Sequence, residues 1–498
     1  MLQALHRGDT DTLRRLYRQE AAERSPLEVW HAASSGGRYD LQHAVLVLHP
    51  HQHIESRLAQ AKRHAPTGAG PKPLNGELHR PLGTDAHESL IRHIKQVPYF
   101  SEKPERLTDA QLNGQVPFAD GGYNGHHIIF CRHLATLWAL QVLTTGKPDY
   151  AVFGTEAALK QGMPSKMQPL YERLLTAAAE NHLVPLTDWG PFVTDQLRTI
   201  AASGETASKV TLVSSGSHVM AMDLKVKQEP DGPLYVANFY DPTLTATHKR
   251  IASKDLGRFE ALRLDSLFKD RRSYDECFRN QSVVSVTVLP SGGEAGIPPL
   301  QPGGDPERRL TSGHPPLDES VVHHLMAGGF AGTLRDLLPE FASLGKKTPY
   351  QASSLLAGRS DDVPGLLAAC MAGQAHTVRA FGQLLDQVPP YRHAWLLAAR
   401  SSNDIPALRA AAAFDHADTV RAFIDCVAGT ALAPAEQLPL LAAKRSQKES
   451  TALGLALALG HLDTVNAYLE GIAAHPGLSA KDRAELLSLQ NEDGLPAL

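Results

Sequence analysis

The strongest constraint on this fold is a repeated pattern in the C-terminal part of the chain. Residues 365–381, 407–423 and 452–468 read GLLAACMAGQAHTVRAF, ALRAAAAFDHADTVRAF and ALGLALALGHLDTVNAY. The Thr-Val pairs place Thr377, Thr419 and Thr464 at steps of 42 and 45 residues. A more degenerate copy, VVHHLMAGGFAGTLRDLL, places Thr333 44 residues before the first of these. A period of this length predicts a stack of similar units rather than one globular core.

Each copy predicts a helix–turn–helix unit. Small residues form the first helix, a Gly/His turn follows, and the second helix opens at the threonine. This is the core of an ankyrin-type repeat, whose usual period of about 33 residues would here be extended by roughly ten loop residues. A generic α-solenoid is the alternative. Because such stacks present a concave face to partners, we expect an all-α ankyrin-type repeat domain over 318–498 that binds another protein.

Two stretches rich in proline and glycine, 64–84 and 290–317, lack helical or strand periodicity and predict linkers. Residues 1–63 read as a helical segment, either a degenerate ankyrin-like copy or a cap. Residues 85–289 do not repeat and mix strand-like with helix-like patterns. If the chain carries chemistry, we expect it in this α+β domain.

Composition excludes several classes of function. The formal net charge of -4 and the pI of about 6.7 provide no basic field for nucleic acid. No apolar run is long enough to span a membrane, and the start of the chain lacks the pattern of a signal peptide. Four cysteines without a CxxC pair predict neither a disulfide framework nor a zinc site. The histidines around His51 are interpreted as surface residues, so we expect no metal and no cofactor.

Cys131 is the first candidate for chemistry. The segment that follows it has one apolar helical face and stops at Gly146 and Pro148, which places Cys131 near the N-terminus of a buried helix. The helix dipole and the adjacent Arg132 or His133 lower the pKa of a thiol there, which favours the nucleophilic thiolate. The alternative is a small buried residue that begins a core helix. Cys277, beside two carboxylates, is a poorer nucleophile, and Cys370 and Cys426 are interpreted as packing residues of the repeats.

His218 and Asp241 lie in a predicted hairpin. Two strand-like runs, 218–227 and 234–241, flank the turn sequence QEPDG. A hairpin centred on 229–230 pairs Met220 with Phe239 and Met222 with Ala237 on one apolar face. The same register places His218 opposite Asp241, about 5 Å apart at the backbone. The alternative is an ordinary edge histidine near an aspartate that ends a strand.

The order of a helical cysteine, a histidine that begins a strand and an aspartate that ends the next is that of papain-like proteases. The sequence therefore predicts an α+β papain-like cysteine protease domain over 85–289, with Cys131, His218 and Asp241 as catalytic residues. Asn124, in a turn upstream of Cys131, is the candidate for a side-chain donor to the oxyanion hole.

Three blocks of this domain, NGHHIIFCRHLA, SSGSHVMAMDLKV and YVANFYDPTLTATHKR, resemble the EspL and Shigella enterotoxin 2 family of type III secreted effectors. The resemblance implies a cysteine protease with C-terminal ankyrin repeats, secreted into the host-cell cytoplasm. It implies Cys131 as nucleophile, His218 as base and Asp241 as orienting acid. The implied substrates are host cell-death signalling proteins with RHIM motifs, whose cleavage would block necroptosis and inflammation. An N-terminal extension of about 80 residues and the long second linker depart from the family pattern and leave the substrate more open than the chemistry.

Two other functions stay open at the level of sequence. An ankyrin-bearing ADP-ribosyl-type transferase effector would use NAD to modify arginines of host caspases, with Arg132, His133, Asp318 and Glu319 in its site. NAD dependence, or activity without Cys131, would indicate it. A non-enzymatic ankyrin adaptor would have a Cys131 thiol no more reactive than the other three.

Overall fold

The computed structural model describes most of the chain from residue 127 onward and short pieces before it. The described residues are 15–17, 101–102, 112–114, 116–118, 127–164, 167–203, 208–244, 246–269, 271–290, 307–360, 362–446 and 449–489. The predicted N-terminal helical segment, apart from residues 15–17, and the first predicted linker lie outside the described residues.

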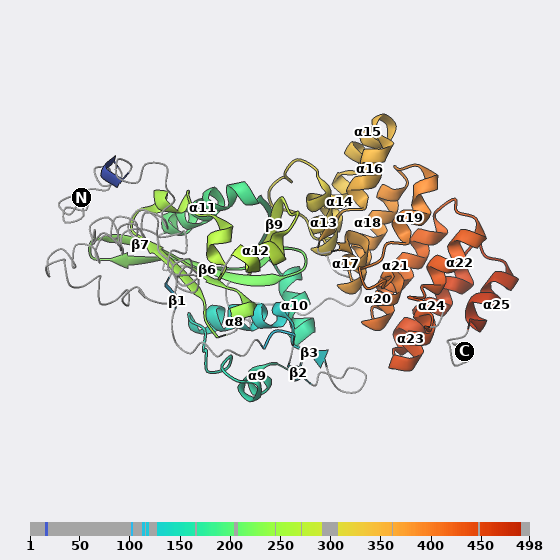
Figure 1. Ribbon diagram of the computed structural model, residues 1–498, viewed down its shortest axis with the longest axis horizontal. Helices are drawn as coiled ribbons and strands as arrows, with labels where there is room; N and C mark the ends of the chain where they lie inside the picture. Colours follow the sequence, from blue (N-terminus) through green and yellow to red (C-terminus); the bar gives the residue numbers. More distant parts are fainter. Residues whose placement is uncertain are drawn as a thin grey trace, which may run out of the picture.

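The first part of the described chain is a mixed α+β domain built on an antiparallel sheet (Figure 1). The sheet has the strand order β1-β8-β7-β6-β5-β9-β4, in which β1 is a short edge strand. Its strands are β1 (Ser101–Glu102), β4 (Glu180–Pro185), β5 (Ser208–Ser214), β6 (Val219–Glu229), β7 (Gly232–Tyr240), β8 (Lys249–Ser253) and β9 (Val283–Val288). The helices of this part are α8 (Cys131–Thr145), α9 (Glu156–Gly162), α10 (Met167–Thr176), α11 (Trp189–Ala202) and α12 (Arg271–Phe278). A small separate pair, β2 (Pro117–Phe118) with β3 (His127–Ile128), and four 3₁₀ turns, Leu186–Asp188, Pro242–Leu244, Leu256–Phe259 and Leu264–Leu267, complete it.

Both faces of the sheet are covered, because its central strands alternate apolar side chains to either side. In β6, Val219 and Ala221 belong to the core that includes α8. Met220 and Met222 belong to the opposite core, which includes α11. The sheet therefore lies between α8 and α11, and it holds the N-terminus of α8 at one end of the strands.

The predicted β6–β7 hairpin is confirmed, but its predicted register is wrong by two residues. Met222 pairs with Phe239 and Leu224 with Ala237, and the last pair is Glu229 with Gly232. The turn is thus Pro230–Asp231 and not 229–230. Proline suits the first of the two turn positions, where its fixed φ fits, whereas the predicted register placed Pro230 second; Gly232, which follows the turn, takes a positive φ of 115°. A shift of two preserves the face of every side chain, so the predicted apolar face is correct.

The second part of the described chain is a helical region that extends away from the sheet to the C-terminus (Figure 1). One layer stacks α13 (Glu319–Ala327), α17 (Gly365–Met371), α20 (Ala407–Ala413) and α23 (Ala452–Leu459). A second layer stacks α14 (Ala331–Asp336), α18 (Ala375–Leu385), α21 (Ala417–Ala428) and α24 (Leu462–Ala474). The remaining elements are α15 (Leu338–Lys347), α16 (Pro349–Leu356), β10 (Arg359–Ser360), β11 (Val363–Pro364), a 3₁₀ turn (Pro390–Arg392), α19 (His393–Leu397), α22 (Pro434–Ala442) and α25 (Ala480–Ser488).

The helix pairs follow the sequence repeat closely. The repeated threonine is the third residue of α14, α18, α21 and α24, so each second helix begins two residues earlier than predicted. Four positions before the threonine the backbone has a positive φ in every unit, at Gly329, Gly373, Asp415 and Gly460. The additional helices α15, α16, α19 and α22 lie between successive pairs and lengthen the period, where the sequence predicted loop. The ankyrin identity of these pairs stays a prediction.

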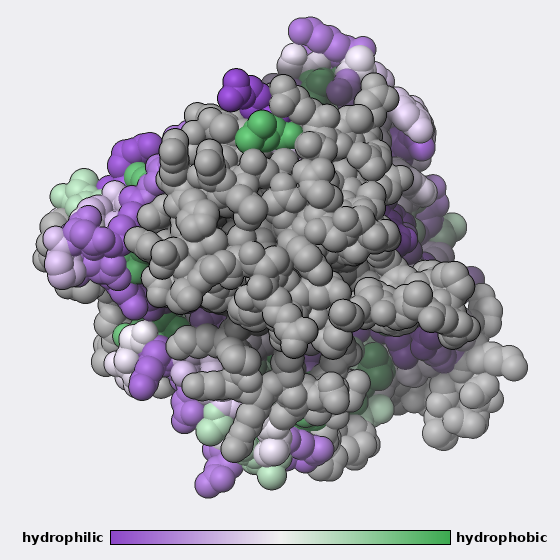
Figure 2. Space-filling model, turned by 60° about the vertical axis from the view of Figure 1, so that its left-hand side comes forward, coloured by the Kyte–Doolittle hydropathy of each residue, from purple (hydrophilic) through white to green (hydrophobic). Residues whose placement is uncertain are grey.

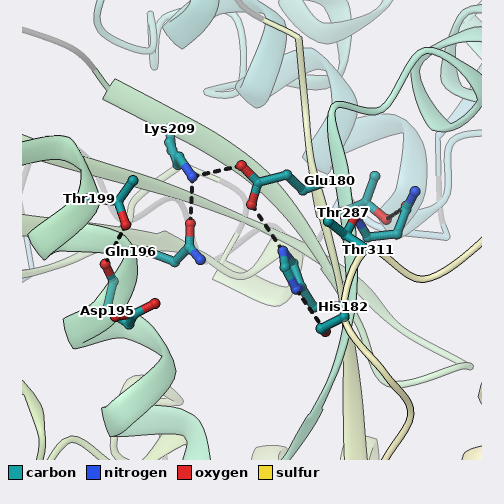
Figure 3. A network of polar contacts seen from close by, with 10 residues as sticks. Glu180, His182, Asp195, Gln196, Thr199, Lys209, Thr287 and Thr311 are labelled. Carbon is teal, nitrogen blue, oxygen red and sulfur yellow. Dashed lines mark hydrogen bonds and ion pairs between the residues drawn. The ribbon is translucent and has the colours of Figure 1, made fainter. Parts of the chain in front are cut away.

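The two parts are joined along the outer edge of β4. The backbone N–H of Thr311 donates to the carbonyl of Asn181 at 2.8 Å, and the N–H of Asn181 donates to the Thr311 hydroxyl at 2.8 Å. Figure 3 shows the polar network beside this edge, where Lys209 binds Glu180 and Gln196, and Glu180 also binds His182. The end of the second predicted linker therefore packs on the sheet; residues 291–306 lie outside the described residues.

Among the described residues, no helix combines the length and the apolar character that crossing a bilayer requires. On the face shown in Figure 2, the described residues are mainly hydrophilic, and hydrophobic ones occur in small groups.

Candidate active site

Cys131 is the first residue of α8, which confirms the prediction that it lies near the N-terminus of a helix. Its neighbour Phe130 precedes the helix in an extended conformation, and the Phe130 N–H donates to the Nδ1 atom of His133 at 3.1 Å. The body of α8 is buried from His133 to Leu140, whereas Cys131 itself is partly exposed. The first N–H groups of a helix have no acceptor within it, and its dipole is positive there. The thiol thus lies where an anion is stabilised and a substrate can reach it.

A tight turn between β5 and β6 holds His218. The N–H of Ser215 donates to the carbonyl of His218 at 3.0 Å, and the N–H of His218 donates to the Ser215 hydroxyl at 3.2 Å. Gly216 has a φ of 89° within this turn, a conformation that favours glycine. The sequence Ser-Ser-Gly-Ser before the histidine carries the signal for this turn, which hydrophobic periodicity does not reveal.

Asp241 follows directly after β7, and its Oδ1 atom lies 2.9 Å from Nε2 of His218. The His218 residue is 8% exposed and Asp241 is 2% exposed. The backbone N–H of Thr243 also donates to Oδ1 of Asp241 at 3.0 Å, which fixes the carboxylate. Both residues lie just outside the strands, so strand alternation does not fix the direction of their side chains. Because Nε2 faces Asp241, the other ring nitrogen of His218 is the one available to the thiol.

The side chains of Cys131, His218 and Asp241 shift one another's pKa values, and each shift has a physical cause. Burial raises the pKa of the Cys131 thiol, but the hydrogen bond and charge of His218, the N–H of Val219 and the charge of Arg132 outweigh it and leave the pKa lowered. Burial lowers the pKa of His218, yet its hydrogen bonds with Asp241 and Cys131 raise it to about 10. Burial also raises the pKa of Asp241, but the hydrogen bonds from His218 and Thr243 outweigh it and leave this pKa lowered. The directions of these shifts favour a thiolate beside an imidazolium that a carboxylate orients.

Of the other predicted residues that the structure describes, Asp318 and Glu319 do not join this set. Asn124 lies outside the described residues, so its predicted role stays a prediction. Asp318 caps α13 by accepting from the N–H of Val321 at 2.8 Å, and Glu319 accepts from the hydroxyl of Ser354. Both acids thus have a structural partner in the helical region.

The remaining cysteines are buried packing residues. Cys370 and Cys426 lie in the core of the helical region, where burial raises the pKa of both thiols, that of Cys426 to about 12. Cys277 is buried in the core between the sheet and α11. No disulfide joins the four cysteines, all of which belong to the described chain.

The described residues contain no cluster of three or more His, Cys, Asp or Glu side chains that could hold a metal ion. The histidines around His51 lie outside this part of the chain.

Comparison with known proteins adds a family to this geometry. Residues 84–360, more than half of the chain, match the family described as the ShET2 enterotoxin, N-terminal region. The matched segment includes the sheet, crosses the second predicted linker and ends with β10. The effector protease OspD3 of Shigella flexneri is 27% identical over 311 residues, which are 61% of this chain and 50% of that protein. The match thus spans about half the length of this relative. No solved structure matches the chain.

Proposed function

The chain belongs to the family of the ShET2 enterotoxin N-terminal region, and from this premise we propose that it is a bacterial effector protease with Cys131, His218 and Asp241 as its catalytic triad. The observation that carries the proposal is the buried 2.9 Å contact between His218 and Asp241, beside a Cys131 thiol at the start of α8 whose pKa His218 lowers. A nucleophile, a base within hydrogen-bond reach and a group that orients the base are the parts that nucleophilic catalysis requires.

In the first half of the reaction the Cys131 thiolate attacks the carbonyl carbon of a peptide bond, and a C–S bond forms. The negative charge moves to the carbonyl oxygen, which the backbone N–H of Cys131 at the helix N-terminus can stabilise. The C–N bond then breaks, and the His218 imidazolium gives its proton to the leaving amine. The product is an acyl-enzyme in which His218 is neutral.

In the second half water attacks the acyl carbon while His218 accepts one of its protons. The C–S bond breaks, the carboxylic acid leaves, and the thiolate–imidazolium pair is restored. Asp241 stays ionised throughout and keeps the ring in place, because its hydrogen bonds stabilise the charged form. The net reaction consumes one water for each peptide bond and requires no cofactor.

The finer features of the proposal rest on resemblance and on the repeat pattern. We assign the sheet domain to the papain-like class because of the order cysteine, histidine, aspartate. The stacked helix pairs are assigned as ankyrin-type repeats that bind a protein partner, since their turn and threonine positions recur in every unit. The family resemblance supports delivery into host cells by a type III system and RHIM-containing cell-death signalling proteins as substrates.

The reaction class can be tested on a host-cell lysate. The full chain is incubated with the lysate in the absence and presence of added NAD, and new protein N-termini are identified by mass spectrometry. We expect new N-termini without NAD and none with a Cys131→Ala variant. No new N-termini with the wild-type chain, or NAD-dependent modification of arginine, would exclude the protease. Cleavage of purified RHIM proteins, against versions without the motif, tests the substrate class separately.

Replacing Asp241 by asparagine is expected to move the alkaline limb of the pH–rate profile downward. The thiolate exists above the lowered pKa of Cys131, and the imidazolium exists below the His218 pKa of about 10, so activity falls outside this window. Without the carboxylate, burial lowers the His218 pKa. We expect the alkaline limb to shift by at least about one pH unit and kcat/KM to fall roughly 10²- to 10⁴-fold.

The matched control for this variant is Glu180→Gln, which removes the carboxylate that binds His182 in the same sheet. It should leave the pH–rate profile in place. An alkaline limb that is unchanged in Asp241→Asn would contradict the proposed role of Asp241.

A further inference from the structure

A cavity of about 270 Å³ opens beside Cys131, between the sheet domain and the helical region. Its volume is far above the roughly 10–15 Å³ that holds a water molecule and close to the lower end of the ~300–1,000 Å³ of ligand pockets. The sheet domain provides Cys131, Arg132, Leu175, Leu212 and Val219 to its lining. The cavity is therefore adjacent to the proposed nucleophile.

The opposite wall comes from the helical region, for which the sequence predicts only the binding of a partner. Val363, Ala368 and Met371 belong to β11 and α17, and Phe414 follows α20. Met371 is 42% exposed and Phe414 is 40% exposed, so both leave apolar surface open to the solvent. A large apolar side chain from a substrate would cover this surface, and methionine adapts to differently shaped partners.

The wall is fixed to the turn that carries His218. The Ser360 hydroxyl, at the end of β10, donates to the carbonyl of Ser215 at 3.2 Å. His323 of α13 lies so close to Gly216 that a Cβ there would approach its Nε2 atom to 2.8 Å. Further along, Ser320 Oγ donates to Oε1 of Gln281 at 2.9 Å and accepts from the N–H of Ser282 at 3.1 Å. These contacts hold the helical region in one position against the active site.

Arg308, which lines the cavity, is already engaged. Arg308 donates to the side-chain oxygen of Asn181 at 2.6 Å and to the carbonyl of Gly328, and its guanidinium stacks on Phe330. An arginine so engaged is part of the wall and is not arranged to recognise an acidic side chain. The chemistry of the cavity favours an apolar occupant.

We infer that this cavity is a specificity pocket shared by the two parts, and that it takes a large apolar side chain near the scissile bond of the substrate. The inference rests on the proposed protease function. It gives the helical repeats a direct role in the choice of cleavage site, in addition to any recruitment of partners.

The test is a cleavage profile of the full-length chain on a peptide library, compared between the wild type and Met371→Asp. The wild type should prefer one large apolar residue, such as Leu or Phe, at one fixed position close to the cleaved bond. In Met371→Asp the ratio of kcat/KM for peptides with Leu to peptides with Lys at that position should fall at least tenfold. The change lies at a partly exposed site, and thermal unfolding checks that the variant folds.

The matched control is Leu462→Asp, which places the same charge on an exposed apolar position of α24, 69% exposed and outside this lining. It should leave the preference unchanged. Two results would contradict the proposed specificity pocket: cleavage of the library by the wild type without an apolar preference, or a wild-type ratio in Met371→Asp. Neither result would contradict the proposed protease function. Because a ratio is measured, partial loss of folded protein does not imitate the effect. A wild-type chain that cleaves no peptide at all would instead count against the proposed function.

Discussion

Replacement of Cys131 by alanine is expected to abolish peptide hydrolysis. The thiolate supplies the only bond to the substrate in the proposed reaction, so its loss removes the covalent route and leaves binding alone. We expect kcat/KM to fall by about 10⁴-fold or more, equivalent to about 5–6 kcal/mol of transition-state stabilisation. Cys131→Ser is expected to fall nearly as far, because a hydroxyl is a much weaker acid than the thiol. The measurement is steady-state hydrolysis of the best library peptide by the purified full-length chain.

The matched control is Cys277→Ala, which removes a buried thiol from the same domain without touching the proposed site. Its kcat/KM should stay within a few-fold of the wild type, although the small cavity that it creates costs stability, about 1–2 kcal/mol. Hydrolysis that survives in Cys131→Ala, or that disappears equally in both variants, would contradict the assignment of the nucleophile.

The sequence predicted the helix of Cys131 and the hairpin of His218 because both depend on local patterns. The apolar spacing after Cys131 and the stop at Gly146 define α8, and the helix indeed starts at Cys131. The two strands were found from their alternation. Their predicted register was wrong by two residues because Pro230 takes the first position of the turn, whereas the predicted register placed it second.

The contact between His218 and Asp241 needed more than strand pairing. His218 lies just before β6 and Asp241 just after β7. Their side chains meet because hydrogen bonds with Ser215 and with the N–H of Thr243 orient the two residues. This orientation depends on hydrogen bonds between residues two or three positions apart in irregular backbone. Hydrophobic periodicity does not encode such bonds.

The part played by the helical region could not be predicted from the sequence at all. The repeats are predicted as a separate unit because they are similar to one another and not to the rest of the chain. The contact of Ser360 with Ser215 joins residues 145 positions apart, and nothing in either segment indicates the other. The same holds for the segment around Thr311, which was predicted as linker from its proline and glycine but pairs with β4.

Replacement of His218 by alanine is expected to cause the second largest loss of activity. It should raise the pKa of the Cys131 thiol and also remove the group that transfers protons. Burial alone raises the pKa of Cys131, and His218 provides the largest opposing effects. Without the imidazole the thiol should be mostly protonated at pH 7, and no group remains to protonate the leaving amine. We expect kcat/KM to fall by about 10³-fold or more and the rate of Cys131 alkylation at pH 7 to fall at least about tenfold.

The alkylation measurement separates this role from a merely structural one. In the wild type, Cys131 should react with iodoacetamide at neutral pH well before the three buried cysteines, and the pH at half-maximal rate should rise in His218→Ala. His182→Ala is the matched control, since His182 also binds a carboxylate in the sheet but has no contact with the thiol. A double variant with Cys131→Ala should lose no more activity than Cys131→Ala alone, because the two residues act in one step. Unchanged alkylation in His218→Ala would show that the histidine does not activate the thiol, and the proposed mechanism would then be wrong at its first step.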